Sequence, residues 1–136
     1  MISAIDTNIL LDILLPNKDF CDASAEALQE SAQEGSLVIC DIVYAELAMH
    51  FERQDECERF LADAQIRLQS LSREALFLSS RIWRQYRMKG GKRTRVLADF
   101  LVGAHAQMHA TRLLSRDRGF YRSLFPTLQI VDPSRS

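Results

Sequence analysis

Short apolar runs alternate with longer amphipathic stretches along this 136-residue chain. Apolar runs of this length predict buried strands at 1–5, 37–40, 112–115 and 128–131. The segment 66–71 is compatible with either a strand or a connector. Short apolar strands separated by helices are typical of a mainly parallel sheet, here of four or five strands, covered on both faces in a three-layer α/β/α sandwich.

The segments between these strands carry helical periodicity together with helix start and stop signals. Helices are expected over 8–15 (capped by Thr7 or Asn8 and ended by Pro16), 19–35, 42–51 (capped by Asp41), 56–64, 72–89, 96–110 and 119–124. The length fits one domain over residues 1–132, with a frayed tail over 133–136.

Charge is distributed unevenly along the chain, although the formal net charge is only −1. Residues 1–71 hold 4 Lys and Arg against 14 Asp and Glu, whereas residues 72–136 hold 13 against 4. The basic excess is densest at 81–95, RIWRQYRMKGGKRTR, where seven cations occur without an acid. Such a stripe favours binding to a phosphate-bearing polymer; a solvated helix face or a surface that pairs with a partner is the alternative.

Hydropathy and cysteine usage indicate a cytoplasmic protein without a membrane anchor. The apolar runs are broken by charge too soon for a membrane-spanning helix, and no signal-peptide pattern is present. Cys21, Cys40 and Cys57 are odd in number and match no zinc or redox spacing, which favours free thiols in a reducing compartment.

Four carboxylates stand in unusually apolar surroundings or just past strand ends. Asp6 follows the first strand directly, and Asp117 follows the run LLS by two residues. Glu46 is the only charge in IVYAELAM, and Asp99 the only charge in VLADFLVGA. Each has an ordinary explanation: Asp6 as a helix cap, Glu46 on a polar helix edge, Asp99 in a first turn, Asp117 as a turn former.

Taken jointly, the four acids are placed to face the edge of the sheet at which α/β proteins bind ligands. Carboxylates about 5 Å apart repel by roughly 3 kcal/mol per pair at an effective dielectric constant near 20. Such a cluster requires protonation or a bound cation. Oxygen ligands without His or Cys indicate Mg²⁺ or Mn²⁺.

Four stretches together resemble the PIN-domain ribonucleases, and among them the VapC-type toxins of type II toxin–antitoxin systems. They are AIDTNILLDIL at 4–14, the Ala-Glu-Leu around Glu46, ADFLVGAHA at 98–106 and LLSRDRGFYRSLFP at 113–126. The resemblance spans nearly the whole chain. It implies that Asp6, Glu46, Asp99 and Asp117 form a catalytic metal site, and that Asn8 and Ser115 support it by hydrogen bonds.

The resemblance also implies an activity and partners. It implies an endoribonuclease that cuts single-stranded or loop RNA, tRNA among the candidates, with Mg²⁺ or Mn²⁺, and that leaves 3′-hydroxyl and 5′-phosphate ends. It implies a homodimer and a VapB-like antitoxin. Within this expectation Asp6, Asp99 and Asp117 bind the metal, Glu46 completes a second metal site or orients the attacking water, and Thr7 adds a supporting donor. The expected RNA contacts are Arg84, Arg87, Lys89, Lys92, Arg93 and Arg95, with Arg116 and Arg118 nearer the cut.

Other readings of the same residues remain open. His105 and His109 share a helix face, but position 106 is Ala where a zinc hydrolase of the HExxH type requires Glu. A phosphatase of the haloacid dehalogenase class requires a second Asp where this chain has Asn8. A nuclease-like fold that only binds RNA is disfavoured by the presence of all four acids. Phe77, Trp83 and Tyr86 either stack on bases or, as their helical spacing favours, form a core or dimer face.

Overall fold

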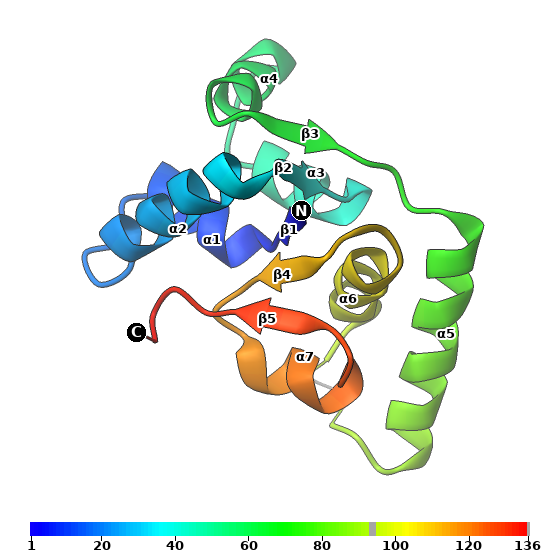
Figure 1. The fold of residues 1–136 in the computed structure, drawn as a ribbon. Coiled ribbons are helices and arrows are strands. Elements are labelled where there is room, and N and C mark those ends of the chain that lie inside the picture. Colours follow the sequence, from blue (N-terminus) through cyan, green and yellow to red (C-terminus); the bar gives the residue numbers. More distant parts are fainter. Residues whose placement is uncertain (93–94, 136) are drawn as a thin grey trace.

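The structure is a computed structural model that describes residues 1–92 and 95–135. Its strands form one five-stranded sheet in the order β3-β2-β1-β4-β5, and every neighbouring pair is parallel (Figure 1). The strands are β1 (Ile2–Ile5), β2 (Ser36–Ile39), β3 (Ile66–Leu68), β4 (Arg112–Leu114) and β5 (Gln129–Val131). The prediction of a parallel α/β sheet is therefore confirmed, and the ambiguous segment 66–71 is a short edge strand followed by a connector.

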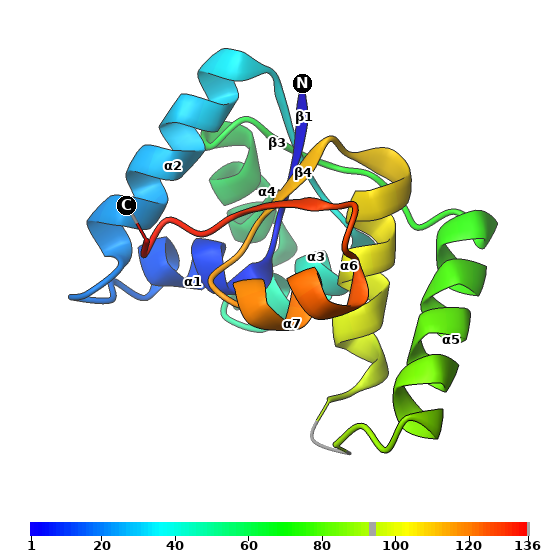
Figure 2. The same cartoon turned by 60° about the horizontal axis from the view of Figure 1, so that its bottom comes forward.

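Helices cover both faces of this sheet. They are α1 (Thr7–Leu14), α2 (Cys21–Glu34), α3 (Asp41–Ala48), α4 (Gln54–Asp63), α5 (Arg73–Met88), α6 (Leu97–His109) and α7 (Arg118–Leu124). Helix α2 packs on β2, while α6 packs on β1 and β4 from the opposite side (Figures 1 and 2). The expected helices are all present, with differences only at their ends, where helices fray. No described helix is long and apolar enough to cross a membrane.

Two caps differ from the sequence prediction. Helix α1 begins after Asp6, whose carboxylate accepts a hydrogen bond from the Thr7 N–H, so the cap is the acid and not Thr7 or Asn8. Asp41 is the first residue of α3 and accepts from the Leu71 N–H at 2.7 Å, because the chain after β3 passes over the start of this helix. The sequence allowed Asp6 as well as Thr7 or Asn8 as the cap, because carboxylate, hydroxyl and amide groups satisfy the same capping rule. The Asp41–Leu71 contact joins residues 30 positions apart and had no local signal.

The strand order creates a topological switch point beside β1. The chain runs from β1 to β2 on one side and returns to place β4 on the other, so the topology reverses between β1 and β4. The Asp6 N–H donates to the Leu114 carbonyl (2.9 Å), which ties the ends of these two strands together. In parallel sheets such a switch point is where ligands bind, outside the carboxyl ends of the strands.

The helices α5 and α6 form a hairpin that extends past this edge (Figure 2). Phe100 of α6 is fully buried and packs against Trp83 and Tyr86 of α5, with ring centroids 6.4 and 5.4 Å away. Trp83 and Tyr86 are partly buried, so that one side of each ring packs against the core, whereas Phe77 is 55% exposed. The end of the hairpin therefore stands beside the carboxyl ends of β1 and β4.

Candidate active site

Asp6 lies directly after β1, at the switch point, and is only 8% exposed. Its carboxylate accepts hydrogen bonds from the Thr7 N–H (2.8 Å) and the Ser115 hydroxyl (2.7 Å), and the Asn8 amide lies 3.4 Å away. Burial raises the pKa of Asp6 from 3.8 to about 6, although the hydrogen bonds oppose this rise, and the charge of Glu46 adds to it. The carboxylate is thus held in place in a setting where its ionisation is costly without a nearby cation.

Glu46, on α3, lies next to the first turn of α1. Its Oε1 accepts a hydrogen bond from the Thr7 hydroxyl at 2.6 Å, which links α3 to the first turn of α1. Thr7 thus donates to Asp6 through its backbone and to Glu46 through its side chain. Glu46 itself is exposed to solvent, which fits a group that meets an incoming water or substrate.

The other two acids share a single cation. The guanidinium of Arg95 bonds both oxygens of Asp117, at 2.6 and 3.3 Å, and lies 4.2 Å from the centre of the Phe120 ring. Asp99, in the first turn of α6, accepts from the Val96 N–H at 3.4 Å. Burial raises the pKa of Asp99, the positive charge of Arg95 lowers it, and the charge of Asp117 raises it again. Arg95 therefore acts as the counter-ion of this half of the site.

Tyr121 joins the two halves. It is 2% exposed, and the pKa of its hydroxyl is raised by burial first and then by the charges of Asp6, Asp99 and Asp117. Its hydroxyl also lowers the pKa of Asp6 through a hydrogen bond. The charges of three aspartates that follow β1, begin α6 and follow β4 thus all act on one buried phenol. The sequence analysis did not single out Tyr121, whose local signal was only an aromatic residue four positions after Asp117.

Ser115 is the second link between the halves. Its hydroxyl donates to Asp6, while its oxygen accepts from the Asp117 N–H at 3.0 Å and lies 3.4 Å from the Asn8 amide. These contacts place Asn8 and Ser115 where a supporting role requires them. The predicted residues at the ends of β1 and β4 are therefore brought together.

Among the described residues, no three His, Cys, Asp or Glu side chains are arranged so that they could already hold a metal ion. The donors nevertheless suit a hard divalent cation in kind, because they are carboxylate oxygens, one of them buried with a raised pKa. Arg95 supplies positive charge to Asp117 in this arrangement. Binding of an ion by all four acids therefore requires the side chains to move closer together.

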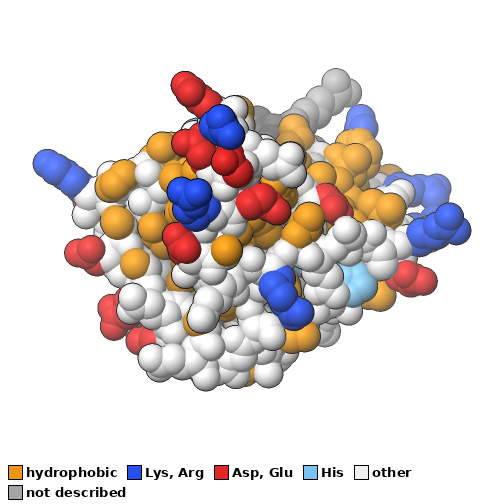
Figure 3. Space-filling view, turned by 90° about the horizontal axis from the view of Figure 1, so that it is seen from above, with side chains coloured by type: hydrophobic (Ala, Val, Ile, Leu, Met, Phe, Trp, Pro, Cys, Tyr) orange, Lys and Arg blue, Asp and Glu red, His pale blue; other side chains and the backbone are white. Residues whose placement is uncertain are grey.

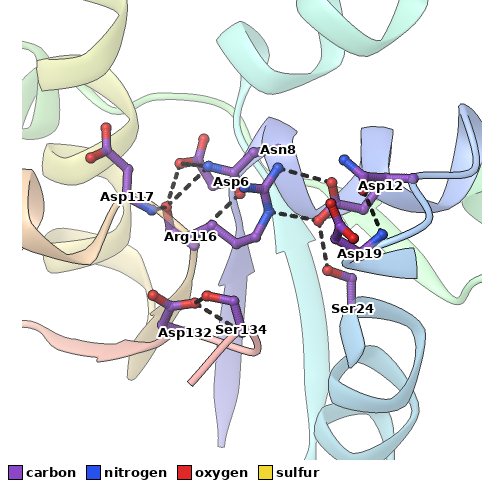
Figure 4. A network of polar contacts seen from close by, with 11 residues as sticks. Asp6, Asn8, Asp12, Asp19, Ser24, Arg116, Asp117, Asp132 and Ser134 are labelled. Atoms are coloured by element: carbon purple, nitrogen blue, oxygen red, sulfur yellow. Dashed lines mark hydrogen bonds and ion pairs between the residues drawn. The ribbon is translucent and has the colours of Figure 1, made fainter. Parts of the chain in front are cut away.

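Arg116, which we expect near the RNA, belongs to a polar network with Asp12 and Ser24 (Figure 4). Its guanidinium makes two bonds to Asp12, at 2.8 and 2.9 Å, and lies 4.1 Å from the centre of the Phe20 ring. Ser24 donates to the same carboxylate at 2.8 Å. The backbone N–H of Arg116 donates to the Asn8 side chain (3.2 Å), so this network anchors the turn that carries Ser115 and Asp117. Asp12 gave no functional signal in the sequence.

The other cations that we expect to contact RNA lie mostly along α5 and between α5 and α6. Figure 3 shows Lys and Arg side chains gathered at the α5 edge of the molecule, and most acidic side chains on that face lie away from it. Arg84, Arg87, Lys89 and Lys92 are exposed, and Arg118 is half-buried at the start of α7. Arg93 lies outside the described residues.

The two histidines of α6 do not form part of this site. His105 is buried, its ring lies 5.4 Å from that of His109, and burial lowers its pKa. His109 Nε2 is 2.7 Å from the Ser72 hydroxyl. Within residues 1–92 and 95–135 no third ligand joins the pair, so the geometry gives the zinc reading no support.

A five-stranded parallel sheet with helices on both faces and acids beyond the ends of its central strands defines a doubly wound α/β protein. A sequence model of the PIN domain matches residues 4–123, so this chain belongs to the PIN domain family. A comparison with curated proteins found no match.

Solved structures share the fold over the full length. A chain of VapBC2 from Rickettsia felis, crystallised bound to a DNA fragment from their promoter, gives a TM-score of 0.74 at 21% identity, covering 97% of this chain and 98% of that one. VapBC-1 from nontypeable Haemophilus influenzae gives 0.73 at 19% identity, with 99% and 100% covered. FitAcB from Neisseria gonorrhoeae gives 0.72 at 17% identity, with both chains fully covered. At these identities the likeness establishes a common fold.

Proposed function

We propose that this protein is a Mg²⁺- or Mn²⁺-dependent endoribonuclease that hydrolyses phosphodiester bonds in single-stranded or loop RNA in the cytoplasm. One observation carries the proposal: Ser115 bonds both the Asp6 carboxylate and the Asp117 N–H, so that acids from the ends of β1 and β4 meet at the switch point of a PIN-domain sheet. Mutual repulsion of these charges is relieved by a divalent cation, which is the cofactor that the resemblance to PIN-domain ribonucleases implies.

In this mechanism Asp6, Asp99 and Asp117 hold the ion, and Glu46 either helps to hold it or orients the attacking water. When bound, the ion lowers the pKa of a water molecule and offsets the negative charge that develops on the phosphate. The Thr7 N–H and the Ser115 hydroxyl keep the Asp6 carboxylate oriented, and the Thr7 hydroxyl does the same for Glu46.

Arg95 has a second part in this mechanism. Arg95 now supplies positive charge to Asp117, and a divalent ion bound there would replace it in that role. The freed guanidinium then has a phosphate oxygen as its natural partner, because Arg pairs with phosphate as it does with carboxylate. Arg95 would therefore turn from the acid to the substrate without leaving the site.

The test uses RNA cleavage with Mg²⁺ or Mn²⁺ supplied. Asp6→Asn and Asp99→Asn should each abolish cleavage while the circular dichroism spectrum stays unchanged. Asp132→Asn is the matched control, because Asp132 is as buried as Asp6 and also follows a strand, β5. Its carboxylate bonds Ser134 and none of the four acids' partners (Figure 4). Activity retained by both site variants would remove the mechanism.

A binding module without catalysis is the second candidate. The observation that favours it is the Arg95–Asp117 ion pair, which leaves the acids without a ready metal site among the described residues. Isothermal titration with Mn²⁺ separates the two functions: an enzyme binds the ion and cleaves, whereas a module that only binds RNA does neither.

We further propose that the nuclease is the toxin of a toxin–antitoxin pair, with a VapB-like antitoxin and a homodimeric state. The support is the full-length fold likeness to VapBC structures and to a toxin–antitoxin complex from Klebsiella pneumoniae. Expression should arrest bacterial growth, and co-expression of the protein encoded upstream should relieve the arrest. Growth unaffected by an active nuclease would instead indicate a housekeeping role in RNA processing.

A further inference from the structure

A cavity of about 340 Å³ opens between the end of α5 and the start of α6. Its lining residues are Trp83, Tyr86, Arg87, Gly91, Lys92, Arg95, Val96 and Leu97. This volume lies at the lower end of the range for small-ligand pockets. The cavity is therefore large enough for one planar ring system and too small for a folded segment of another protein.

Two aromatic rings in its wall are held in fixed positions. Trp83 and Tyr86 pack on the buried ring of Phe100, and the Tyr86 hydroxyl donates to the Lys92 carbonyl at 2.9 Å. The Gly91 backbone lies so close to Tyr86 that a Cβ there would come within 2.5 Å of the ring. A ring that enters the cavity thus meets pre-positioned aromatic surface, which lowers the entropic cost of stacking.

The charges around this wall are of one sign. Arg87, Lys92 and Arg95 carry positive charge, and the described lining includes no carboxylate. The Arg87 guanidinium already lies 5.6 Å from the centre of the Trp83 ring. Aromatic surface beside cations is how proteins hold single-stranded nucleic acid, because each base stacks and each phosphate is neutralised.

The cavity adjoins the candidate active site through one residue. Arg95 lines it and also bonds both oxygens of Asp117. A base in the cavity therefore places its own phosphate, or the next one, within reach of the carboxylates. The hairpin that contains the cavity stands beside the carboxyl ends of the strands, where Asp6 lies (Figure 2).

We propose that this cavity is a nucleobase-binding pocket in which a base of the RNA substrate stacks on Trp83 and Tyr86 and so sets where the strand is cut. The proposal rests on the proposed ribonuclease function. Stacking is tolerant of sequence, so the pocket selects an unpaired base rather than a particular one. A base held in a duplex cannot enter, which limits cleavage to single strands and loops.

The sole tryptophan of the chain lies in the pocket and reports on it directly. The experiment titrates the full-length Asp6→Asn protein in EDTA, so that no strand is cut. The probes are a single-stranded RNA tetramer and a tetramer of equal charge with tetrahydrofuran abasic residues. Trp83 emission should be quenched by the RNA, and anisotropy of 5′-labelled strands should show about 10-fold tighter binding of RNA than of the abasic strand.

Two substitutions locate the effect. Val96→Phe fills the pocket from a side chain that is 57% exposed, so the fold is not disturbed, and it should remove both the quenching and the preference for bases. Leu76→Phe is the matched control, because Leu76 is 46% exposed on α5 but does not line the pocket, and it should change neither.

Three results would overturn the pocket: equal affinity for both strands, a base preference that leaves Trp83 emission unchanged, or no response to either strand. Equal affinity for both strands would mean that the cations bind only phosphate. No response to either strand would indicate that the cavity binds an apolar side chain of a protein partner. Because neither metal nor turnover is needed, these results are independent of the nuclease test. A protein without nuclease activity can still bind a base in the pocket, and an active nuclease can fail to do so.

Discussion

Substitutions of the buried ion pair between Asp12 and Arg116 should have non-additive effects on the free energy of unfolding. The loss of Arg116 should also destabilise the protein more than the loss of the Asp12 charge. The Asp12 side chain is 3% exposed and accepts two hydrogen bonds from Arg116 and one from Ser24. The Arg116 side chain is 25% exposed and rests against the Phe20 ring. Removal of one partner from a buried pair costs about 3–5 kcal/mol, because the other charge is left without compensation.

The two single substitutions leave different charges behind. Arg116→Met leaves a carboxylate that water cannot reach, so its cost should fall within that range, about 3–4 kcal/mol. Asp12→Asn leaves a guanidinium that is partly in water, so its cost should be lower, about 1.5–3 kcal/mol. The double variant removes both charges and should cost about 2 kcal/mol less than the sum of the single variants.

Urea unfolding followed by circular dichroism measures these costs. With a denaturant slope of roughly 2 kcal/mol per M, Arg116→Met should lower the midpoint by about 1.5–2 M. Because the Asp12–Arg116 side-chain pair anchors the turn that carries Ser115 and Asp117, RNA cleavage should also fall in all three variants. Additive costs, or a larger loss for Asp12→Asn than for Arg116→Met, would refute the reasoning.

Two further predictions concern the acids of the candidate site. Since the pKa of Asp6 is raised from 3.8 to about 6, metal-free protein should lose roughly 3 kcal/mol of stability through this group as pH rises from about 4 to 7, because the folded state holds the proton more tightly than the unfolded chain. Urea unfolding of wild type and Asp6→Asn in EDTA should show this dependence only in the wild type; equal pH profiles would contradict it. Arg95→Gln removes the cation that competes for Asp117, so Mn²⁺ should bind several-fold more tightly by isothermal titration while RNA cleavage falls; weaker Mn²⁺ binding would show that Arg95 is not a competitor.

The parts of the site that the sequence could indicate were those with a local signature. Asp6, Glu46, Asp99 and Asp117 were conspicuous because each stands beside apolar residues or a strand end, and the charges of three of them raise the pKa of Tyr121. Their role as metal ligands stays a prediction. Asp12 and Tyr121 could not be singled out in the same way, since an acid on a helix and an aromatic near a turn have many ordinary uses.

The sequence by itself determined the class of fold and the positions of the elements. The period of the apolar residues and the length of each apolar run are local properties of the sequence. They indicate which face of an element is buried, so segments such as 37–40 and 96–110 were recognisable in isolation. The motif at 4–14 and the stretch at 113–126 also indicated the PIN domain family, which the match over residues 4–123 confirms.

Only the tertiary structure decided which side chains meet. Ser115 and Asp6 are 109 positions apart, and Arg116 and Asp12 are 104 apart, yet both contacts arise because β4 lies next to β1. Arg95 and Asp117 meet because the chain after the α5–α6 hairpin returns through β4 to the same edge. Such pairings depend on strand order and register, which no local pattern encodes, and they decide where positive charge stands among the acids.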